Sequence, residues 1–376
     1  MEQNVISISG GKDSTALLLH AIERETENMH VVFADTGHEH PATLEYVDYL
    51  GSALSLPIRW VRADFTAQIA RKRDFVANKW PGALMKGRPE KTGYWLLTDP
   101  DFAAANDNLP EPSQAPHNPI EPARYGPWEW VPTIPGIDPM TEDQAGLVVE
   151  RALSALRPTG NPFLDMCLWK GRFPSAKARF CTGHLKVEPI NEHVVNPLLS
   201  AGHSVLSWQG VRAEESAARA RLAERGLAHT AKNGAELWDY RPILKWSIDD
   251  VFAIARHHGI KPNPLYTMGM GRVGCMPCIH ARKNELLEIS KRFPEEVARV
   301  AEWEDLVAMA AKRGSSTFFA ACDLGCRHND KRAQEAGNIH RFVDWAKTSR
   351  GGKQFDFLRA DNENLTTCSS IYGLCE

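Results

Sequence analysis

The segment that decides the fold lies near the start of the chain and reads Val5-Ile6-Ser7-Ile8-Ser9-Gly10-Gly11-Lys12-Asp13-Ser14-Thr15-Ala16-Leu17-Leu18-Leu19. A short β-branched run ends in two glycines, and a leucine-rich stretch with apolar pairs four residues apart, such as Leu17 and Ala21, follows at once. This pattern predicts a strand, a tight turn and a helix. Glycines let the backbone approach an anion, and the first N–H groups of the helix point at it with the positive end of the helix dipole behind them. The segment therefore predicts a phosphate-binding loop.

The polar residues of this loop are the first candidate nucleotide ligands. They are Ser9, Gly10, Gly11, Lys12, Asp13, Ser14 and Thr15. The loop is not a Walker A motif, because Ile6 stands where the first glycine should be and Asp13 follows the lysine. A glycine-rich turn without a ligand is the alternative, but a lysine, an aspartate and three hydroxyls around two glycines favour phosphate binding.

Length and composition limit the function classes. A chain of 376 residues predicts two domains, or one domain with large insertions. A net charge of −3 excludes a global basic field, so extended non-specific coating of DNA is not expected. The N-terminus has no basic region, and no segment approaches the roughly 18 apolar residues of a membrane helix. We expect a cytoplasmic protein without a membrane partner, whose eight cysteines are ligands or reactive thiols rather than disulfides.

The next elements predict a Rossmann-like α/β fold. A strand at 31–34, a helix at 42–54 and a strand at 58–61 continue a βαβαβ pattern, which indicates a doubly wound parallel sheet. Residues at the carboxyl end of the second strand should face the same crevice as the glycine loop. These candidates are Asp35, Thr36 and Gly37. We expect Asp35 to contact ribose or Mg²⁺, although a solvated loop that caps the next helix remains an alternative.

Four regions follow from the pattern. Residues 1–71 are the first part of the nucleotide-binding α/β domain, and residues 72–157 are a proline-rich insertion. From Pro81 onward the prolines should break any long element, so the insertion is expected to be partly irregular and to act as a lid or a substrate-specific surface, or as a floppy linker. Residues 158–280 complete the α/β domain, and residues 281–376 form a mostly helical region that carries cluster or zinc ligands.

Two further stretches carry charge suited to phosphates. The strand that starts at Ser204 ends in Gly210, Arg212 and Glu215, where a guanidinium held by carboxylates could clamp a phosphate or sulfonate. A second stretch interleaves cations with aromatic residues. It contains Trp169, Lys170, Arg172, Phe173, Lys177, Arg179, Phe180 and Lys186. This composition is expected where phosphates and bases meet protein, but it also occurs on ordinary surfaces.

The cysteines predict a metal or cluster site. Cys275 and Cys278 form a C-x₂-C pair in a glycine-rich loop, which supplies half of a tetrahedral set. The other candidates are Cys167, Cys181, Cys322, Cys326, Cys368 and Cys375. Three fates remain open for these thiols, namely a [4Fe–4S] cluster, structural zinc, and a reactive redox or persulfide-carrying pair.

With these residues in hand, the chain resembles the phosphoadenosine phosphosulfate (PAPS) reductase family of adenine nucleotide α-hydrolases, within the ATP pyrophosphatase (PP-loop) superfamily. The resemblance covers residues 5–61 and about 161–280. It rests on Ser-Gly-Gly-Lys-Asp-Ser at 9–14, Asp-Thr-Gly-His-Glu at 35–39, Cys181 through Lys-Val-Glu-Pro at 186–189, Gly210-x-Arg212-x-x-Glu215-Ser216, and Gly274-Cys275-x-x-Cys278. It implies a [4Fe–4S] cluster on Cys181, Cys275 and Cys278, with Cys368 or Cys375 as further candidate ligands.

The sequence departs from the family pattern in three places. Phe180 replaces the first cysteine of the family's Cys-Cys pair. The C-terminal Glu-Cys-Gly-Leu/Ile-His motif of sulfonucleotide reductases is absent. The first loop is complete, as in the ATP-splitting relatives, whereas reductases that act on PAPS have a degenerate loop. The resembling enzymes with a complete loop and a cysteine cluster insert sulfur, such as the DNA phosphorothioation ATPase and tRNA thiolases.

The resemblance thus implies an ATP pyrophosphatase that uses Mg²⁺ and adenylylates its substrate for sulfur transfer. Lys12, Asp13 and Arg212 are the expected catalytic residues, with a sulfur donor such as a cysteine desulfurase and a nucleic-acid or small-molecule acceptor as partners. One alternative is a reductase of PAPS or adenosine phosphosulfate that uses Cys368 or Cys375 as nucleophile. Another is a zinc-stabilised protein that senses nucleotides or binds nucleic acid. The oligomeric state stays open, a homo-oligomer included.

Overall fold

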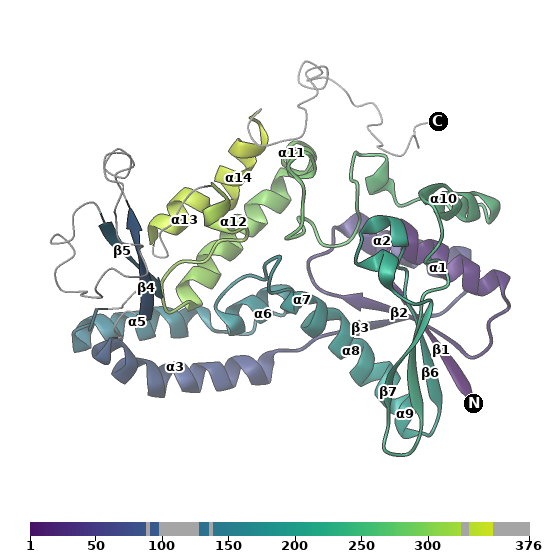
Figure 1. The fold of residues 1–376 in the computed structure, drawn as a ribbon, viewed down its shortest axis with the longest axis horizontal. Coiled ribbons are helices and arrows are strands. Elements are labelled where there is room, and N and C mark those ends of the chain that lie inside the picture. The colour runs from purple at the N-terminus through teal and green to yellow at the C-terminus, as the bar shows by residue number, and fades with distance from the viewer. Residues whose placement is uncertain (88–90, 98–127, 135–137, 325–330, 349–376) are drawn as a thin grey trace, which may run out of the picture. The chain divides into compact units, whose positions relative to one another are not determined.

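A computed structural model describes residues 1–87, 91–97, 128–134, 138–324 and 331–348 (Figure 1). The chain divides into two compact units. The first contains residues 1–70 and 154–376, and the second contains residues 71–153. The first unit holds the predicted α/β domain, and it is the one that positions the candidate site.

The first unit is built on a six-stranded sheet. Its strands are β1 (Glu2–Ile8), β2 (Met29–Asp35), β3 (Ile58–Arg62), β6 (Ser204–Trp208), β7 (Arg225–Thr230) and β8 (Glu236–Tyr240). Their order is β3-β2-β1-β6-β8-β7, and all neighbours are parallel except β7, which runs antiparallel to β8. The predicted doubly wound α/β fold is confirmed. The strand order reverses between β1 and β6, and in such sheets a ligand binds outside the carboxyl ends of the strands at this point.

Some helices of the first unit cover the two faces of the sheet, and others form the C-terminal region (Figure 1). They are α1 (Lys12–Glu23), α2 (Pro41–Ala53), α6 (Pro162–Lys170), α7 (Phe180–Thr182), α8 (Glu188–Ile190), α9 (Asn196–Ser200), α10 (Ile248–His257), α11 (Lys283–Arg292), α12 (Pro294–Ala310), α13 (Lys331–Gly337) and α14 (Ile339–Ala346). The predicted helical character of the C-terminal region is confirmed in its described part. The start of α10 is fixed by a capping box, in which the Ser247 hydroxyl accepts the Asp250 N–H at 3.1 Å.

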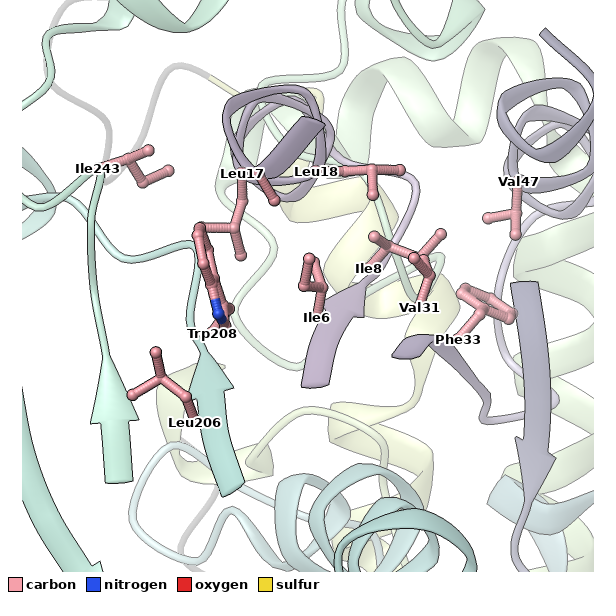
Figure 2. Close-up of a cluster of buried hydrophobic side chains, with 11 residues drawn as sticks. Ile6, Ile8, Leu17, Leu18, Val31, Phe33, Val47, Leu206, Trp208 and Ile243 are labelled. Atoms are coloured by element: carbon pink, nitrogen blue, oxygen red, sulfur yellow. The ribbon is translucent and has the colours of Figure 1, made fainter. Parts of the chain in front are cut away.

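The core follows from the alternation of side chains along β1. Figure 2 shows Ile6 and Ile8 on the face covered by α1, where they meet Leu17 and Leu18. Val5 points to the opposite face and packs in a separate buried cluster with residues such as Val194. Full burial of each such aliphatic side chain is worth about 1.5–3 kcal/mol. The two clusters hold the end of β1, and the loop that follows it, in a fixed position.

A continuous helical run connects α7, α8 and α9 and contains two π-helical turns. These turns span Gly183–Val187 and Asn191–Val195. π-helical turns are rare and frequently occur at functional sites. The first of them carries Lys186.

The second unit contains more regular structure than its prolines suggested. It comprises most of α3 (Thr66–Lys86), the antiparallel pair β4 (Lys91–Leu97) and β5 (Trp128–Ile134), and α5 (Glu142–Ala155). The expectation that Pro81 breaks a long element was wrong, because Pro81 lies inside the 21-residue helix α3. Val76 and Leu84, on either side of it, are buried, so packing offsets the missing backbone hydrogen bond. Residues 98–127 of the predicted insertion lie outside the described residues.

No helix in the described ranges combines the length and the apolar character needed to cross a membrane.

Candidate functional site

The loop after β1 is held in one conformation by its own polar groups. Gly10 has φ +70°, and a Cβ there would lie 2.8 Å from Thr43 Cγ2, so only glycine fits. The Ser14 hydroxyl accepts the Ser9 N–H at 3.0 Å and donates to the Gly11 carbonyl at 2.9 Å. Thr15 Oγ1 donates to the same carbonyl at 3.1 Å. The predicted turn between strand and helix is therefore present, and α1 begins directly behind it at Lys12.

Tyr266 contacts the first turn of α1, although it is 254 residues away in sequence. Its hydroxyl accepts the Lys12 backbone N–H at 2.9 Å, and its buried ring lies 5.7 Å from Lys12 Nζ. The first N–H groups of a helix need an acceptor from outside the helix, and an anion also serves this purpose. Sequence analysis missed this residue, and the only local signal was the rigid Pro-x-Pro segment before it.

Asp13 joins the ends of β1 and β6. Its Oδ1 lies 2.5 Å from Arg212 Nε, and its Oδ2 lies 3.0 Å from Lys12 Nζ. Gly210 allows this approach, because a Cβ there would lie 3.2 Å from the Asp13 carbonyl group. The three residues predicted to be catalytic, Lys12, Asp13 and Arg212, therefore form one network at the point where the strand order reverses.

Arg212 is buried, and its charge is balanced on several sides. Its Nη1 lies 2.8 Å from Glu214 Oε2, and its backbone N–H donates to Glu215 Oε2 at 3.0 Å. Burial alone would lower the pKa of Arg212, but the hydrogen bond and charge of Asp13, with Glu215 and Glu214, raise it. Glu215 also pairs with Arg219. Arg212 is thus a permanently charged group held in a fixed orientation.

The end of β2 supplies the next side chains. Asp35 Oδ1 accepts the Gly37 N–H at 2.8 Å, and Asp35 Oδ2 lies 3.4 Å from Arg62 Nε. Asn161 Nδ2 donates to the Gly37 carbonyl at 2.6 Å, which ties this turn to the start of α6. Thr36 is fully buried and donates to Glu39 rather than to the crevice. Of the three candidates predicted here, Asp35 keeps a partly exposed carboxylate, as the prediction of a ribose or Mg²⁺ contact requires.

Glu39 connects this turn to the cysteine loop. Its carboxylate accepts the Thr36 N–H at 3.0 Å and hydroxyl at 2.7 Å, and Cys275 Sγ lies 3.9 Å from it. The two segments also share an antiparallel bridge between Glu39 and Cys275. Burial, and then the Glu39 charge, raise the pKa of Cys275 to about 12. Glu39 therefore links the turn after β2 to the loop that carries Cys275.

His38 holds the same cysteine loop from the other side. It is fully buried, its Nε2 lies 2.8 Å from the Pro277 carbonyl, and its carbonyl accepts the Met276 N–H at 2.9 Å. Arg299 Nη2 donates to the Met276 carbonyl at 3.0 Å and lies 3.2 Å from His38 Nδ1. Burial, and then the Arg299 charge, lower the pKa of His38 to about 3, so the ring is neutral. Sequence analysis did not foresee this role.

Three thiols gather around Lys186. Burial would lower the pKa of Lys186, but the acidic groups around it, Cys275 first and then Glu39, Cys278 and Cys181, raise it. Cys181, which sequence analysis grouped with Cys275 and Cys278, is therefore near them. The fully buried Cys167 lies near enough to Cys181 for the two thiols to interact electrostatically.

The described thiols do not complete a metal site. Across the described ranges, no three His, Cys, Asp or Glu side chains are arranged to hold a metal ion. A [4Fe–4S] cluster or structural zinc usually takes four protein ligands, and the thiols grouped around Lys186 are three, Cys181, Cys275 and Cys278. The predicted ligands Cys368 and Cys375, and the candidate Cys326, lie outside the described residues, and Cys322 is exposed.

Comparison with known proteins gives a consistent result. A family model of the phosphoadenosine phosphosulfate reductase domain matches residues 3–96 and 163–281. The uncharacterized 37.8 kDa protein in the gpa 5′ region of Escherichia phage 186 is 46% identical over 382 residues, which cover 99% of this chain and 96% of that protein. Adenosine 5′-phosphosulfate reductase of Allochromatium vinosum is 37% identical over 113 residues, or 30% of this chain and 40% of that enzyme. The chain thus matches less than half of that reductase's length.

Among solved structures, a crystal structure of phosphoadenylyl-sulfate (PAPS) reductase from Candida auris in a phosphate complex aligns with a TM-score of 0.32 and 14% sequence identity. The alignment covers 73% of this chain and 81% of that chain.

Proposed function

This chain belongs to the phosphoadenosine phosphosulfate reductase family, and we propose that within it the protein acts as an ATP pyrophosphatase that prepares an acceptor for sulfur transfer. In the first step an acceptor oxygen attacks the α-phosphorus of ATP, the bond between the α-phosphorus and the bridging oxygen to the β-phosphorus breaks, and pyrophosphate leaves. In the second step a sulfur nucleophile attacks the activated acceptor, and AMP leaves with the acceptor oxygen.

The observation that carries this proposal is the network of Lys12, Asp13 and Arg212 beside the complete glycine loop. It brings two cations and the positive end of α1 to the same edge of the sheet. Pyrophosphate gains negative charge as it leaves, and fixed positive groups are most effective where such charge develops. A sulfonucleotide offers no pyrophosphate to leave, so a reductase has no comparable use for the complete loop.

The roles of the loop residues follow from their contacts. The Gly10 and Gly11 amides and Lys12 bind pyrophosphate, and Arg212 stabilises the developing charge. Both Asp13 oxygens already contact cations, so Asp13 orients Lys12 and Arg212. We assign Mg²⁺ to Asp35, because Asp35 Oδ2 lies 3.4 Å from the exposed Arg62 side chain, a longer contact than the 2.5 and 3.0 Å contacts of Asp13 with its two cations.

The test measures ATP binding and pyrophosphate release. We expect the purified protein to bind a non-hydrolysable ATP analogue in isothermal titration calorimetry, and Lys12→Ala to weaken binding at least tenfold. Lys232→Ala is the matched control, because Lys232 is exposed in the turn before β8, at the sheet edge opposite the loop. Equal affinity in Lys12→Ala and Lys232→Ala would contradict the proposal, and sulfite release from PAPS without pyrophosphate release from ATP would favour the reductase alternative.

The cofactor requires a separate measurement. Since the described residues supply three grouped thiols and no complete ligand set, no step above depends on an iron–sulfur cluster or on zinc. A [4Fe–4S] cluster that includes Cys181, Cys275 and Cys278 remains part of the proposal, with zinc as its alternative. Iron, sulfide and zinc analysis of anaerobically purified protein distinguishes the two, and Cys278→Ser should lower the content of the metal that is bound.

A further inference from the structure

A cationic surface lies between α6 and α7, outside the glycine loop. We define it by four cations and two aromatic residues, namely Lys170, Arg172, Lys177, Arg179, Trp169 and Phe180. Arg172, Lys177 and Arg179 are exposed, and Lys170 is half-buried. Within the part of the chain that the structure describes, none of the four cations forms an ion pair. In a protein with a net charge of −3, this is a local concentration of positive charge.

The aromatic residues of this surface are in direct contact with its cations. Lys170 Nζ lies 3.7 Å from the centre of the Trp169 ring, and Arg172 Cζ lies 5.6 Å from the centre of the Phe180 ring. Trp169 is stacked on Phe65 at 5.7 Å between ring centres, which fixes its orientation. Both Trp169 and Phe180 are half-buried. Cations that follow a phosphate backbone and rings on which bases stack are the two components of a single-strand binding groove.

The surface continues toward the cysteine loop. Arg179 is two residues from Cys181, and Arg272 is three residues from Cys275. A strand that follows the cations as far as Arg179 would therefore run toward Cys181, on the part of the fold that also carries the nucleotide loop.

We propose that this surface binds single-stranded nucleic acid, independently of the proposed reaction. Aromatic stacking favours a strand with unpaired bases over a duplex, whose bases are already stacked on each other.

The test uses the full chain and fluorescein-labelled 20-mers of oligo-dT and oligo-U, with a DNA duplex of the same length, in fluorescence anisotropy at 50 mM salt. We expect binding of at least one single strand and weaker binding of the duplex. Arg172→Glu/Arg179→Glu should weaken binding at least tenfold and reduce the slope of log K against log salt by about 2. Lys232→Glu/Lys291→Glu, an equal charge change at two exposed lysines, should change binding less than twofold.

A third variant separates stacking from charge. Phe180→Leu should weaken binding at least threefold without changing the salt slope, because it removes a ring and no cation. The proposal is overturned if the wild type binds neither single strand, if the duplex binds more tightly than both, or if the two double variants lose affinity equally. ATP binding is measured on every variant. Loss of oligonucleotide binding with normal ATP binding assigns the failure to this surface, and the reverse result assigns it to the proposed function.

Discussion

Replacing Gly10 by alanine tests the geometry of the phosphate loop most directly. Two effects add at this position. The left-handed φ of +70° costs an alanine about 1 kcal/mol, and a Cβ 2.8 Å from Thr43 Cγ2 adds about 1–3 kcal/mol of overpacking. Gly202 is the matched control, since it has φ +82° but nothing within 4 Å of the added Cβ. We therefore expect Gly10→Ala to lower the free energy of unfolding by about 2–4 kcal/mol and Gly202→Ala by about 1 kcal/mol.

The assay is urea denaturation followed by tryptophan fluorescence, with the ATP analogue titrated in parallel. Thr43→Ser removes the Cγ2 that the new methyl group meets, so in that background Gly10→Ala should cost about 1 kcal/mol less. Gly10→Ala should also weaken analogue binding, whereas Gly202→Ala should not. Equal costs for the two glycine variants, or no recovery with Thr43→Ser, would refute the close approach of Gly10 to α2.

Two further predictions concern stability. Burial raises the pKa of Glu304 to about 7, although hydrogen bonds from the Phe318 and Ile339 N–H groups oppose this shift. The folded protein therefore holds the Glu304 proton more tightly than the unfolded chain does. The resulting stabilisation of the fold is full below about pH 4.5 and is lost as pH rises through 7, a difference of about 3 kcal/mol. Glu304→Gln should flatten the pH dependence of the unfolding free energy between pH 4.5 and 8, and a slope equal to that of the wild type would contradict this. Trp208→Phe removes the 2.8 Å hydrogen bond from Nε1 to the buried Asn4 Oδ1. The free energy of unfolding should fall by about 1–3 kcal/mol, and the melting temperature should fall with it. A melting temperature unchanged from the wild type would show that the bond contributes nothing.

The part of the fold that sequence predicts well is the part that depends on local pattern. The βαβαβ order and the turn at Gly10 both depend on residues within a few positions of one another. The contact between Asp13 and Arg212 could also be predicted, because parallel strands place their carboxyl ends at one edge of the sheet. Strand β7 was not predicted. It is mostly exposed at the sheet edge and carries little hydrophobic pattern.

The contacts that sequence could not predict are set by tertiary packing. Two such contacts join residues more than 200 positions apart, namely Tyr266 with Lys12 and Glu39 with Cys275. No sequence motif connects the members of either pair. The error at Pro81 has a related cause. Proline lowers local helix propensity, but the burial of neighbouring side chains decides whether the helix continues. Whether the candidate residues bind nucleotide or metal remains a prediction.

The hydroxyl of Tyr266 has a consequence for how the loop exchanges its partners. A phosphate oxygen that accepts the Lys12 backbone N–H must displace this hydroxyl. One hydrogen-bond acceptor then replaces another. The gain from binding is therefore the difference between a charged and a neutral acceptor, rather than the whole worth of a new hydrogen bond. In the proposed reaction this exchange would favour the release of pyrophosphate, because the Tyr266 hydroxyl can accept the Lys12 N–H again.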